Sequence, residues 1–145
     1  MNILVSACLL GVACRYDGKS KGVEKIIELS GKYNLIPVCP EQLGGLPTPR
    51  VPSERLDNRV VNSNGEDVTN EYKKGAEETL RLAKIFHCPL AILKAKSPSC
   101  GCGKIYDGSF SKNLIEGNGI TTDLLLKNNI KVINEDSIEN ILNYL

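Results

Sequence analysis

The sequence has little net charge, a single histidine and no long apolar run. Its 145 residues include 18 basic and 17 acidic side chains, and the net charge of +1 argues against direct binding of nucleic acid or of an anionic membrane surface. No stretch approaches the roughly 20 apolar residues of a membrane span, and residues 1–5 lack the charged and apolar regions of a signal peptide. We therefore expect a cytoplasmic protein of one domain, residues 1–145, with a small-molecule partner.

The six cysteines lack paired spacing, since no Cys-x-x-Cys motif occurs. Such pairs supply the ligands of most structural zinc sites, and a thioredoxin-like dithiol needs the same spacing at a helix start. Zinc is therefore the second choice among metals, and a thioredoxin-like site is not predicted. In a reducing compartment, cysteines serve in metal binding, redox chemistry or nucleophilic attack.

Short apolar runs alternate with helical periodicity along the chain. The runs have the length and β-branched content of buried strands and cover residues 3–5, 35–38, 90–93 and 131–133. Helical spacing of apolar residues predicts helices over 23–30, 69–86 and 138–145, with Thr69 as the N-cap of the second. This alternation predicts an α/β fold with a Rossmann-like or flavodoxin-like, mainly parallel sheet and helices on both faces.

Two further segments carry turn signals. Residues 44–52 contain two glycines and three prolines, so they are predicted to form an ordered loop of restricted backbone freedom. Residues 59–61, with the turn signal Asn64-Gly65, predict an added hairpin.

Three cysteines follow three of the predicted strands. Cys8 follows the first, Cys39 the second and Cys100 the third. Ligands of open α/β sheets bind beyond the carboxyl ends of the strands, where loops from neighbouring strands can bring these thiols together. One buried cysteine after a strand is commonplace, but three after three strands favour a metal site with soft thiolate ligands.

The remaining cysteines occupy other positions. Cys88 and the only histidine, His87, precede a strand and so belong to the opposite edge of the sheet, where Cys88 is predicted to be a core thiol. Cys14 lies in the loop after the first strand and is a candidate ligand, supporting thiol or resolving cysteine. Cys102 forms a Cys-Gly-Cys pair with Cys100, and geometry alone leaves either residue as the ligand.

Three thiolates without an evident fourth suit an iron–sulfur cluster with one open iron, which acts on a substrate as a Lewis acid. Glu41 lies two residues after Cys39. In a confined loop this carboxylate can serve as a proton shuttle, and a loop salt bridge is the alternative role.

Other polar residues near these cysteines are candidates for contacts to substrate. Ser97, Ser99 and the N–H groups around Gly101 can donate hydrogen bonds to it, although Ser-Pro-Ser is also ordinary turn chemistry. Three cations are candidates to neutralise a cluster or orient a substrate, with surface solvation as the alternative: Arg15, Arg50 and Lys94.

Four motifs follow one another along the chain: VSACLLG at residues 5–11, CRYDG at 14–18, PVCPEQLGGLPTPR at 37–50 and SPSCG at 97–101. Segments 65–69, 75–76 and 105–110 extend the likeness over nearly the whole chain. In these motifs and their order the chain resembles the thiouracil desulfidase family.

The resemblance implies an oxygen-sensitive [4Fe-4S] cluster bound by Cys8, Cys39 and Cys100, with the fourth iron open to substrate. It implies a non-redox desulfuration of thiouracil or a related thionucleobase to uracil and sulfide, in which the open iron binds the substrate sulfur. Glu41 is implied as the acid/base residue, and Ser97 and Ser99 as residues that position the substrate.

Two alternatives to a desulfidase follow from the same residues. One is an iron–sulfur-dependent sulfur transferase or carrier, for example in tRNA thiolation, against which the near-neutral charge argues only weakly. The other is a non-catalytic metal-binding module that acts as a sensor or structural unit. Two roles stay open for Cys102: it is a ligand in place of Cys100, or it relays sulfur.

Overall fold

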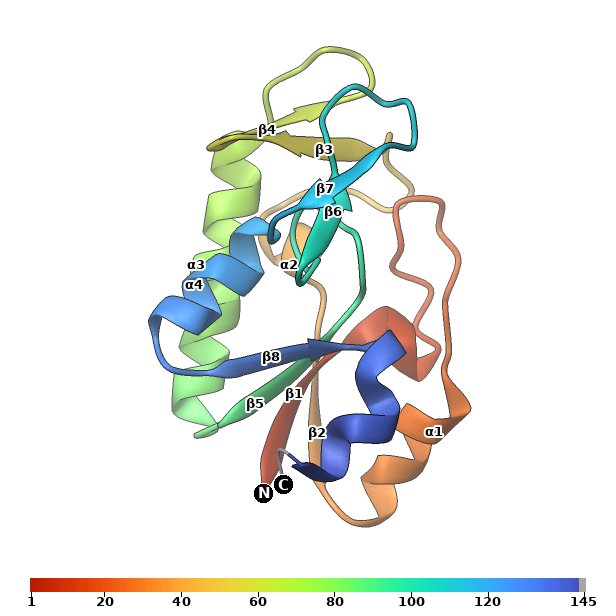
Figure 1. Ribbon diagram of the computed structural model, residues 1–145, viewed down its shortest axis with the longest axis vertical. Helices are drawn as coiled ribbons and strands as arrows, with labels where there is room; N and C mark the ends of the chain where they lie inside the picture. Colours follow the sequence, from red (N-terminus) through yellow and green to blue (C-terminus); the bar gives the residue numbers. More distant parts are fainter. Residues whose placement is uncertain (144–145) are drawn as a thin grey trace.

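A four-stranded parallel sheet lies at the centre of the computed structural model, which describes residues 1–143 (Figure 1). The strand order is β2-β1-β5-β8, and every pair is parallel. All four predicted strands are present: β1 (Asn2–Ser6), β2 (Asn34–Val38), β5 (Leu90–Leu93) and β8 (Lys131–Asn134). The order is flavodoxin-like, and it places the topological switch point between β1 and β5, where sheets of this kind bind ligands.

Helices and hairpins surround this sheet. The helical elements are η1 (Ala7–Leu10), α1 (Glu24–Ile27), η2 (Glu28–Gly31), α2 (Pro40–Leu43), α3 (Thr69–Ile85), α4 (Ile120–Lys127) and η3 (Glu135–Asn143), where η denotes a 3₁₀ helix. Two antiparallel hairpins pair β3 (Ser53–Leu56) with β4 (Arg59–Asn62) and β6 (Lys104–Tyr106) with β7 (Leu114–Glu116).

The sheet is covered on both faces because alternate strand residues enter two separate clusters. Ile3 and Ile92 pack with Ile26 of α1 on one face, whereas Leu4 packs with Leu125 of α4 on the other. In Figure 1, α1 and η3 lie on one side of the sheet and α3 and α4 on the other. The predicted α/β architecture with helices on both faces is thereby confirmed.

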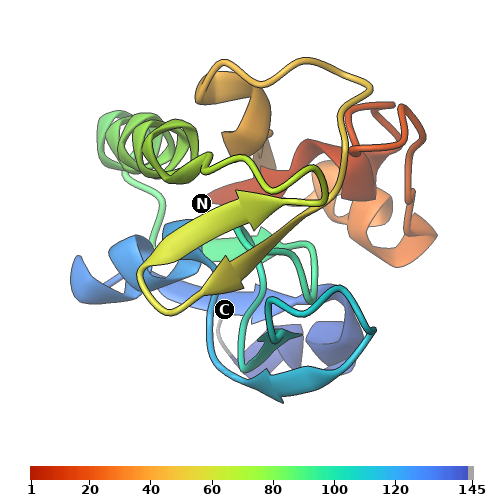
Figure 2. The same ribbon diagram turned by 90° about the horizontal axis from the view of Figure 1, so that it is seen from above.

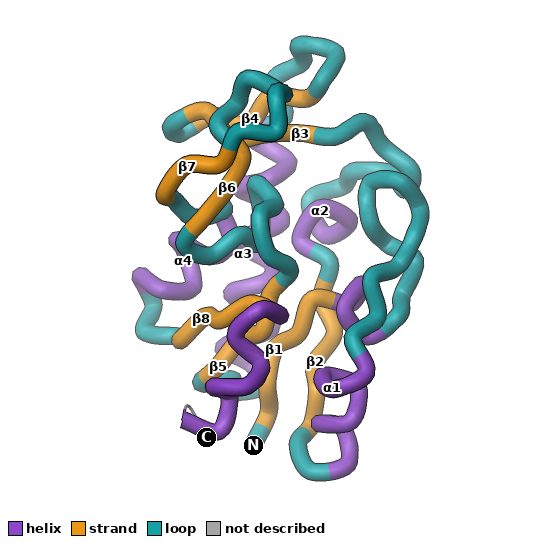
Figure 3. Tube along the Cα trace, turned by 45° about the vertical axis from the view of Figure 1, so that its right-hand side comes forward, coloured by secondary structure: helices purple, strands orange, loops and turns teal. Residues whose placement is uncertain are grey.

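Both hairpins stand beyond the carboxyl ends of the strands (Figure 1), and in the view from above they lie in front of the sheet (Figure 2). The longer loops gather at the same end of the molecule (Figure 3). Residues 59–61 do form a hairpin, but it pairs with β3 through a turn at residues 57–58. Asn64-Gly65 makes the following turn, after which Asp67 bridges back to Val61. The β6–β7 hairpin is not among the predicted elements.

Three helix predictions need correction. The helix predicted over 23–30 is a four-residue α1 continued as 3₁₀ helix η2. Thr69 is the first residue of α3 rather than its N-cap, since Val68 holds that position and the Thr69 hydroxyl accepts the N–H of Val60 at 2.9 Å. The C-terminal segment is 3₁₀ helix η3 as far as Asn143, and Leu145 lies outside the described residues.

Across residues 1–143, no helix combines the length and the apolar character that a membrane crossing requires.

Candidate metal and active site

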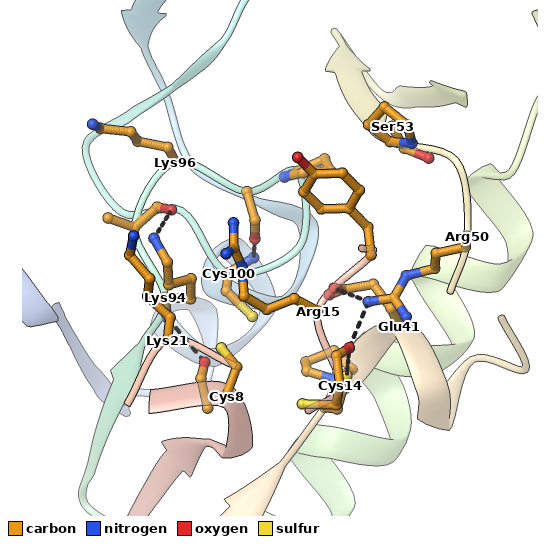
Figure 4. A pocket seen from close by; sticks show the side chains of 18 of the residues that line it. Cys8, Cys14, Arg15, Lys21, Glu41, Arg50, Ser53, Lys94, Lys96 and Cys100 are labelled. Atoms are coloured by element: carbon orange, nitrogen blue, oxygen red, sulfur yellow. Dashed lines mark hydrogen bonds and ion pairs between the residues drawn. The ribbon is translucent and has the colours of Figure 1, made fainter. Parts of the chain in front are cut away.

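A cavity of about 510 Å³ lies beyond the carboxyl ends of β1, β2 and β5 (Figure 4). Its wall includes the residues that directly follow those strands and residues of the two hairpins that cover it. Four thiols line this cavity: Cys8, Cys14, Cys39 and Cys100. The structure thus brings together the three cysteines predicted from the strand ends and adds Cys14 to them.

Cys8 is held by the short 3₁₀ helix η1, which begins directly after β1. This helix ends at Gly11, whose φ of 98° is a left-handed conformation that glycine adopts without strain. The carbonyl of Cys8 accepts the N–H groups of Gly11 at 3.2 Å and Lys21 at 3.0 Å. The Cys8 backbone is therefore fixed by two separate parts of the chain.

Cys39 is the N-cap residue of α2, with Pro40 as the first residue of the helix. Two glycines press α2 against α3: a Cβ on Gly75 would lie 2.0 Å from the Pro40 carbonyl oxygen, and one on Gly44 would lie 2.0 Å from the Glu71 carbonyl oxygen. Only residues without a side chain permit this approach. The glycine contact therefore sets the position of Cys39 and of the α2 residues that follow it.

Cys100 lies in a turn held mainly by hydrogen bonds. Its N–H donates to the Ser97 hydroxyl at 2.7 Å, and its carbonyl accepts the hydroxyl of Thr122 at 2.9 Å. The N–H of Thr121 donates to the Ser99 carbonyl at 2.9 Å, and the N–H of Gly101 donates to the Ser97 carbonyl at 2.9 Å. The beginning of α4 therefore anchors this turn. Gly101 has no free N–H for a substrate, contrary to expectation.

Cys14 contacts two of the predicted ligands. The hydrogen bond with Cys39 lowers the pKa of the Cys14 thiol, but the contact with Cys8, burial and the charge of Glu41 outweigh it and raise that pKa to about 11. The same thiol contact with Cys14, together with burial and the charge of Glu41, raises the pKa of Cys39. Both residues are therefore protonated thiols at neutral pH, and Cys39 has to lose its proton to bind a metal.

The pKa of the Cys100 thiol is raised for a simpler reason. Burial is the main cause, followed by the negative charge of Glu41, while hydrogen bonds with Ser6 and Ser99 act in the opposite direction. A positive centre in the cavity would reverse this balance, because it would favour the thiolate that burial now disfavours.

Cys88 and Cys102 do not line the cavity. Cys88 is packed in the apolar cluster with Ala83 and Leu125, as predicted for a core thiol. The Cys102 thiol donates to the carbonyl of Val132 at 3.5 Å. Of the two residues in the Cys-Gly-Cys pair, the structure therefore directs Cys100 to the cavity and Cys102 to the sheet.

Glu41 lines the cavity from α2 and is paired with Arg50 of the following loop. Its Oε2 accepts from the Arg50 guanidinium at 3.0 Å, whereas its Oε1 is buried and has no hydrogen-bond partner among the described residues. Because an unpaired buried carboxylate oxygen is costly, this atom marks a position at which a further donor is expected. Glu41 therefore forms the salt bridge that the sequence left as one alternative, and it also keeps one carboxylate oxygen unpaired among the described residues.

The two predicted serines differ in placement. Ser97 lines the cavity, and its hydroxyl accepts the Cys100 N–H while keeping its own proton. Ser99 is fully buried behind the wall, where its hydroxyl pairs with that of Thr121 at 2.9 Å. Ser99 therefore faces Thr121 of α4 and does not line the cavity, so its geometry does not support the expectation that it positions substrate.

Positive side chains dominate the cavity lining. Six cationic side chains line it against two acidic ones, which are Glu41 and Glu54. Of the three predicted cations, Arg15 pairs loosely with Asp17 at 3.7 Å, and Lys94 pairs with Glu135 at 2.8 Å. The sequence reasoning overlooked three lysines of this lining: Lys21, Lys96 and Lys112.

Tyr72 is another lining residue that the sequence reasoning overlooked. In the sequence it is only one of the residues at helical spacing within the helix predicted over 69–86. Burial is the main cause that raises the pKa of its phenol, and the charge of Glu41 adds to it, whereas a hydrogen bond with Ser53 lowers it. A tyrosine on a buried helix face is the signal that a polar partner lies at that position.

The donor set fits a cluster better than a single ion. Within residues 1–143, no three His, Cys, Asp or Glu side chains are grouped so that one metal ion would be held between them. The thiols instead surround a cavity whose charged lining is mainly positive. Iron–sulfur clusters take cysteine thiolates as ligands and are anionic when so bound, so both features suit them.

Comparisons with known proteins agree with this chemistry. A family model described as 2-thiouracil desulfurase matches residues 3–137. An uncharacterized protein of Bacillus subtilis, YbbK, is 43% identical over 150 residues, which cover 97% of this chain and 99% of the relative. A solved structure of the [4Fe-4S]-dependent thiouracil desulfidase TudS is similar with a TM-score of 0.92 and 44% identity, covering 99% of each chain.

Proposed function

The chain belongs to the 2-thiouracil desulfurase family, and we propose that it removes sulfur from 2-thiouracil or a related thionucleobase to give uracil and sulfide without net redox change. The observation that carries the proposal is the meeting of Cys8, Cys39 and Cys100 in one cavity with Glu41. These are the residues that such a reaction needs: soft ligands for iron and a carboxylate for proton transfer.

Cys8, Cys39 and Cys100 are the proposed ligands of a [4Fe-4S] cluster. The mainly positive lining of the cavity supports this assignment because it offsets the negative charge of a thiolate-bound cluster. When bound, the cluster supplies an iron without a protein ligand, and this Lewis acid attracts the soft sulfur of the substrate and polarises the attached carbon.

Glu41 is the proposed acid/base residue. Glu41 lines the cavity, and its buried Oε1 is unpaired among the described residues, which leaves this oxygen free to take a proton from a water that attacks the ring carbon or to give one to the substrate. Ser97 is the proposed positioning residue. Its hydroxyl proton is not used by the Cys100 turn and can be donated to a ring oxygen or nitrogen.

The setting of the protein is also a proposal. All six cysteines are free thiols, which supports a reducing compartment such as the cytoplasm. We further propose that residues 1–145 act as one [4Fe-4S]-binding domain whose partner is the thionucleobase and that neither nucleic acid nor a membrane is bound directly.

The test is turnover of 2-thiouracil by protein that has been loaded with iron and sulfide under anaerobic conditions. We expect uracil and sulfide in equal amounts. Glu41→Gln keeps the size of the side chain but removes the base, so kcat should fall by about 10²- to 10⁴-fold with the visible spectrum of the cluster unchanged. Glu77→Gln, on the exposed side of α3, is the matched control and should retain wild-type kcat.

Two results would contradict the proposal. Loaded protein that releases no uracil from any thionucleobase would exclude the reaction, and full activity of Glu41→Gln would remove this residue from it. Sulfur release that requires an added acceptor thiol would favour the sulfur transferase instead.

A further inference from the structure

We propose that Arg50 is a positioning residue that holds Glu41 by Oε2 and so keeps Oε1 available for proton transfer. The inference rests on the proposed function, because Glu41 is the acid/base residue there. It concerns a residue that is argued to act through Glu41, with which it forms an ion pair.

The Arg50 guanidinium is almost fully buried, with 6% of the side chain exposed, and is fixed on three sides. One terminal nitrogen, Nη1, donates to the Pro47 carbonyl at 3.1 Å and to the Thr48 hydroxyl at 2.9 Å. The other, Nη2, donates to Glu41 Oε2 and to the Cys14 carbonyl, each at 3.0 Å. These bonds leave the planar group no freedom to rotate, so its position determines the position of the carboxylate.

The contact partners of Arg50 link Glu41 to the cysteine-bearing segments. The Cys14 carbonyl that Arg50 binds also accepts the thiol of Cys39 at 3.7 Å. Figure 4 shows the guanidinium between the Glu41 carboxylate and the Cys14 backbone. Arg50 therefore sets the distance between the acid/base group and the proposed ligands rather than only neutralising a buried charge.

The two oxygens of the Glu41 carboxylate have different surroundings. Oε2 is satisfied by Arg50, whereas Oε1 is buried and unpaired among the described residues. Had Arg50 approached in the bidentate manner common for such pairs, both oxygens would carry a guanidinium hydrogen bond, and Oε1 would no longer be free of a protein donor. The single contact is thus the geometry that a reactive carboxylate requires.

The test replaces the planar guanidinium of Arg50, which donates from two nitrogens, by the single ammonium group of lysine. Arg50→Lys keeps the positive charge but loses the fixed geometry, so kcat should fall by about 10- to 100-fold, the loss expected of a misplaced catalytic group, while KM changes less than about threefold. Iron and sulfide content and the visible spectrum should match wild type. Arg59→Lys, in an exposed ion pair with Asp67, is the matched control and should change none of these quantities.

A double-mutant cycle shows whether Arg50 acts through Glu41. If it does, adding Arg50→Lys to Glu41→Gln should lower kcat by less than about twofold, because the group that Arg50 positions has already been removed. Arg50→Ala offers a second route: guanidinium ion, added far below denaturing concentrations, should restore part of its kcat.

The outcomes separate this inference from the proposed function. Wild-type kcat in Arg50→Lys, an undiminished loss in the Glu41→Gln background, or loss of iron instead of kcat would overturn the role of Arg50 alone. A fully active Glu41→Gln, or loaded wild-type protein without turnover, would overturn both.

Discussion

Cys100 and Cys88 are equally buried, with 4% of each residue exposed, and both belong to the same apolar cluster, yet they lie at opposite ends of β5. Cys88 precedes β5 and lies in the apolar core, where burial alone raises its pKa. Cys100 follows β5, lines the cavity, and contacts Ser6 and Ser99 within the field of Glu41. Burial therefore does not distinguish a structural thiol from a proposed ligand. What distinguishes the two thiols is the end of the strand at which each one lies, because loops and polar groups converge only at the carboxyl end.

The position of Cys39 at the cavity depends on the close contact between α2 and α3, and Gly75→Ala breaks this contact. The new Cβ would lie 2.0 Å from the Pro40 carbonyl oxygen, between Cys39 and Glu41. We expect the free energy of unfolding to fall by about 3 kcal/mol, measured by urea denaturation, because backbone cannot move aside cheaply. Iron content of the reconstituted protein should fall with it.

Gly31→Ala is the matched control for that substitution. A Cβ on Gly31 meets nothing within 4 Å, so its effect should stay within about 0.5 kcal/mol. Equal stability of the two variants would show that α2 can shift away from α3 without harm and that the glycine contact does not fix Cys39.

Ser99 and Ser97 allow the same comparison between a buried residue and a cavity residue, with smaller expected effects. Ser99→Ala leaves the buried Thr121 hydroxyl without its partner and should lower the free energy of unfolding by about 1–2 kcal/mol, with kcat/KM for 2-thiouracil little changed. Ser97→Ala removes a hydroxyl from the cavity, together with the acceptor of the Cys100 N–H, and should lower kcat/KM by about tenfold, the worth of one hydrogen bond. Steady-state kinetics and urea denaturation on both variants measure the contrast.

The opposite pattern, with Ser99→Ala impaired in turnover and Ser97→Ala not, would place the substrate on the α4 side of the turn. It would also restore Ser99 as a contact residue.

The sheet was predictable from sequence because its strands contain continuous apolar runs, which are buried along nearly the whole of the two central strands, β1 and β5. Because ligands bind beyond the carboxyl ends of such strands, the predicted sheet also predicted where the cavity lies, and the cavity contains Cys8, Cys39 and Cys100. Spacing alone left the choice between Cys100 and Cys102 open. That choice depends on the hydrogen bonds between the turn and α4, which join segments about 20 residues apart.

Other parts of the site were not predictable for a related reason. The β6–β7 hairpin is short and its β7 strand is exposed, so it lacks an apolar pattern that would mark it. Lys96 and Lys112 could not be assigned to the cavity without it. Thr69 fits an N-cap by residue type, but its hydroxyl binds Val60, nine residues earlier, and tertiary contact overrides the local preference.

The measurement that tests the central claim most directly is the iron and sulfide content of anaerobically reconstituted protein, compared between thiols at the cavity and thiols outside it. We expect about four irons and four sulfides per chain in wild type, in Cys88→Ser and in Cys102→Ser, and loss of most of both in Cys8→Ser, Cys39→Ser and Cys100→Ser. Full iron and sulfide in Cys100→Ser, loss of both in Cys88→Ser, or zinc without sulfide in wild type would contradict the account.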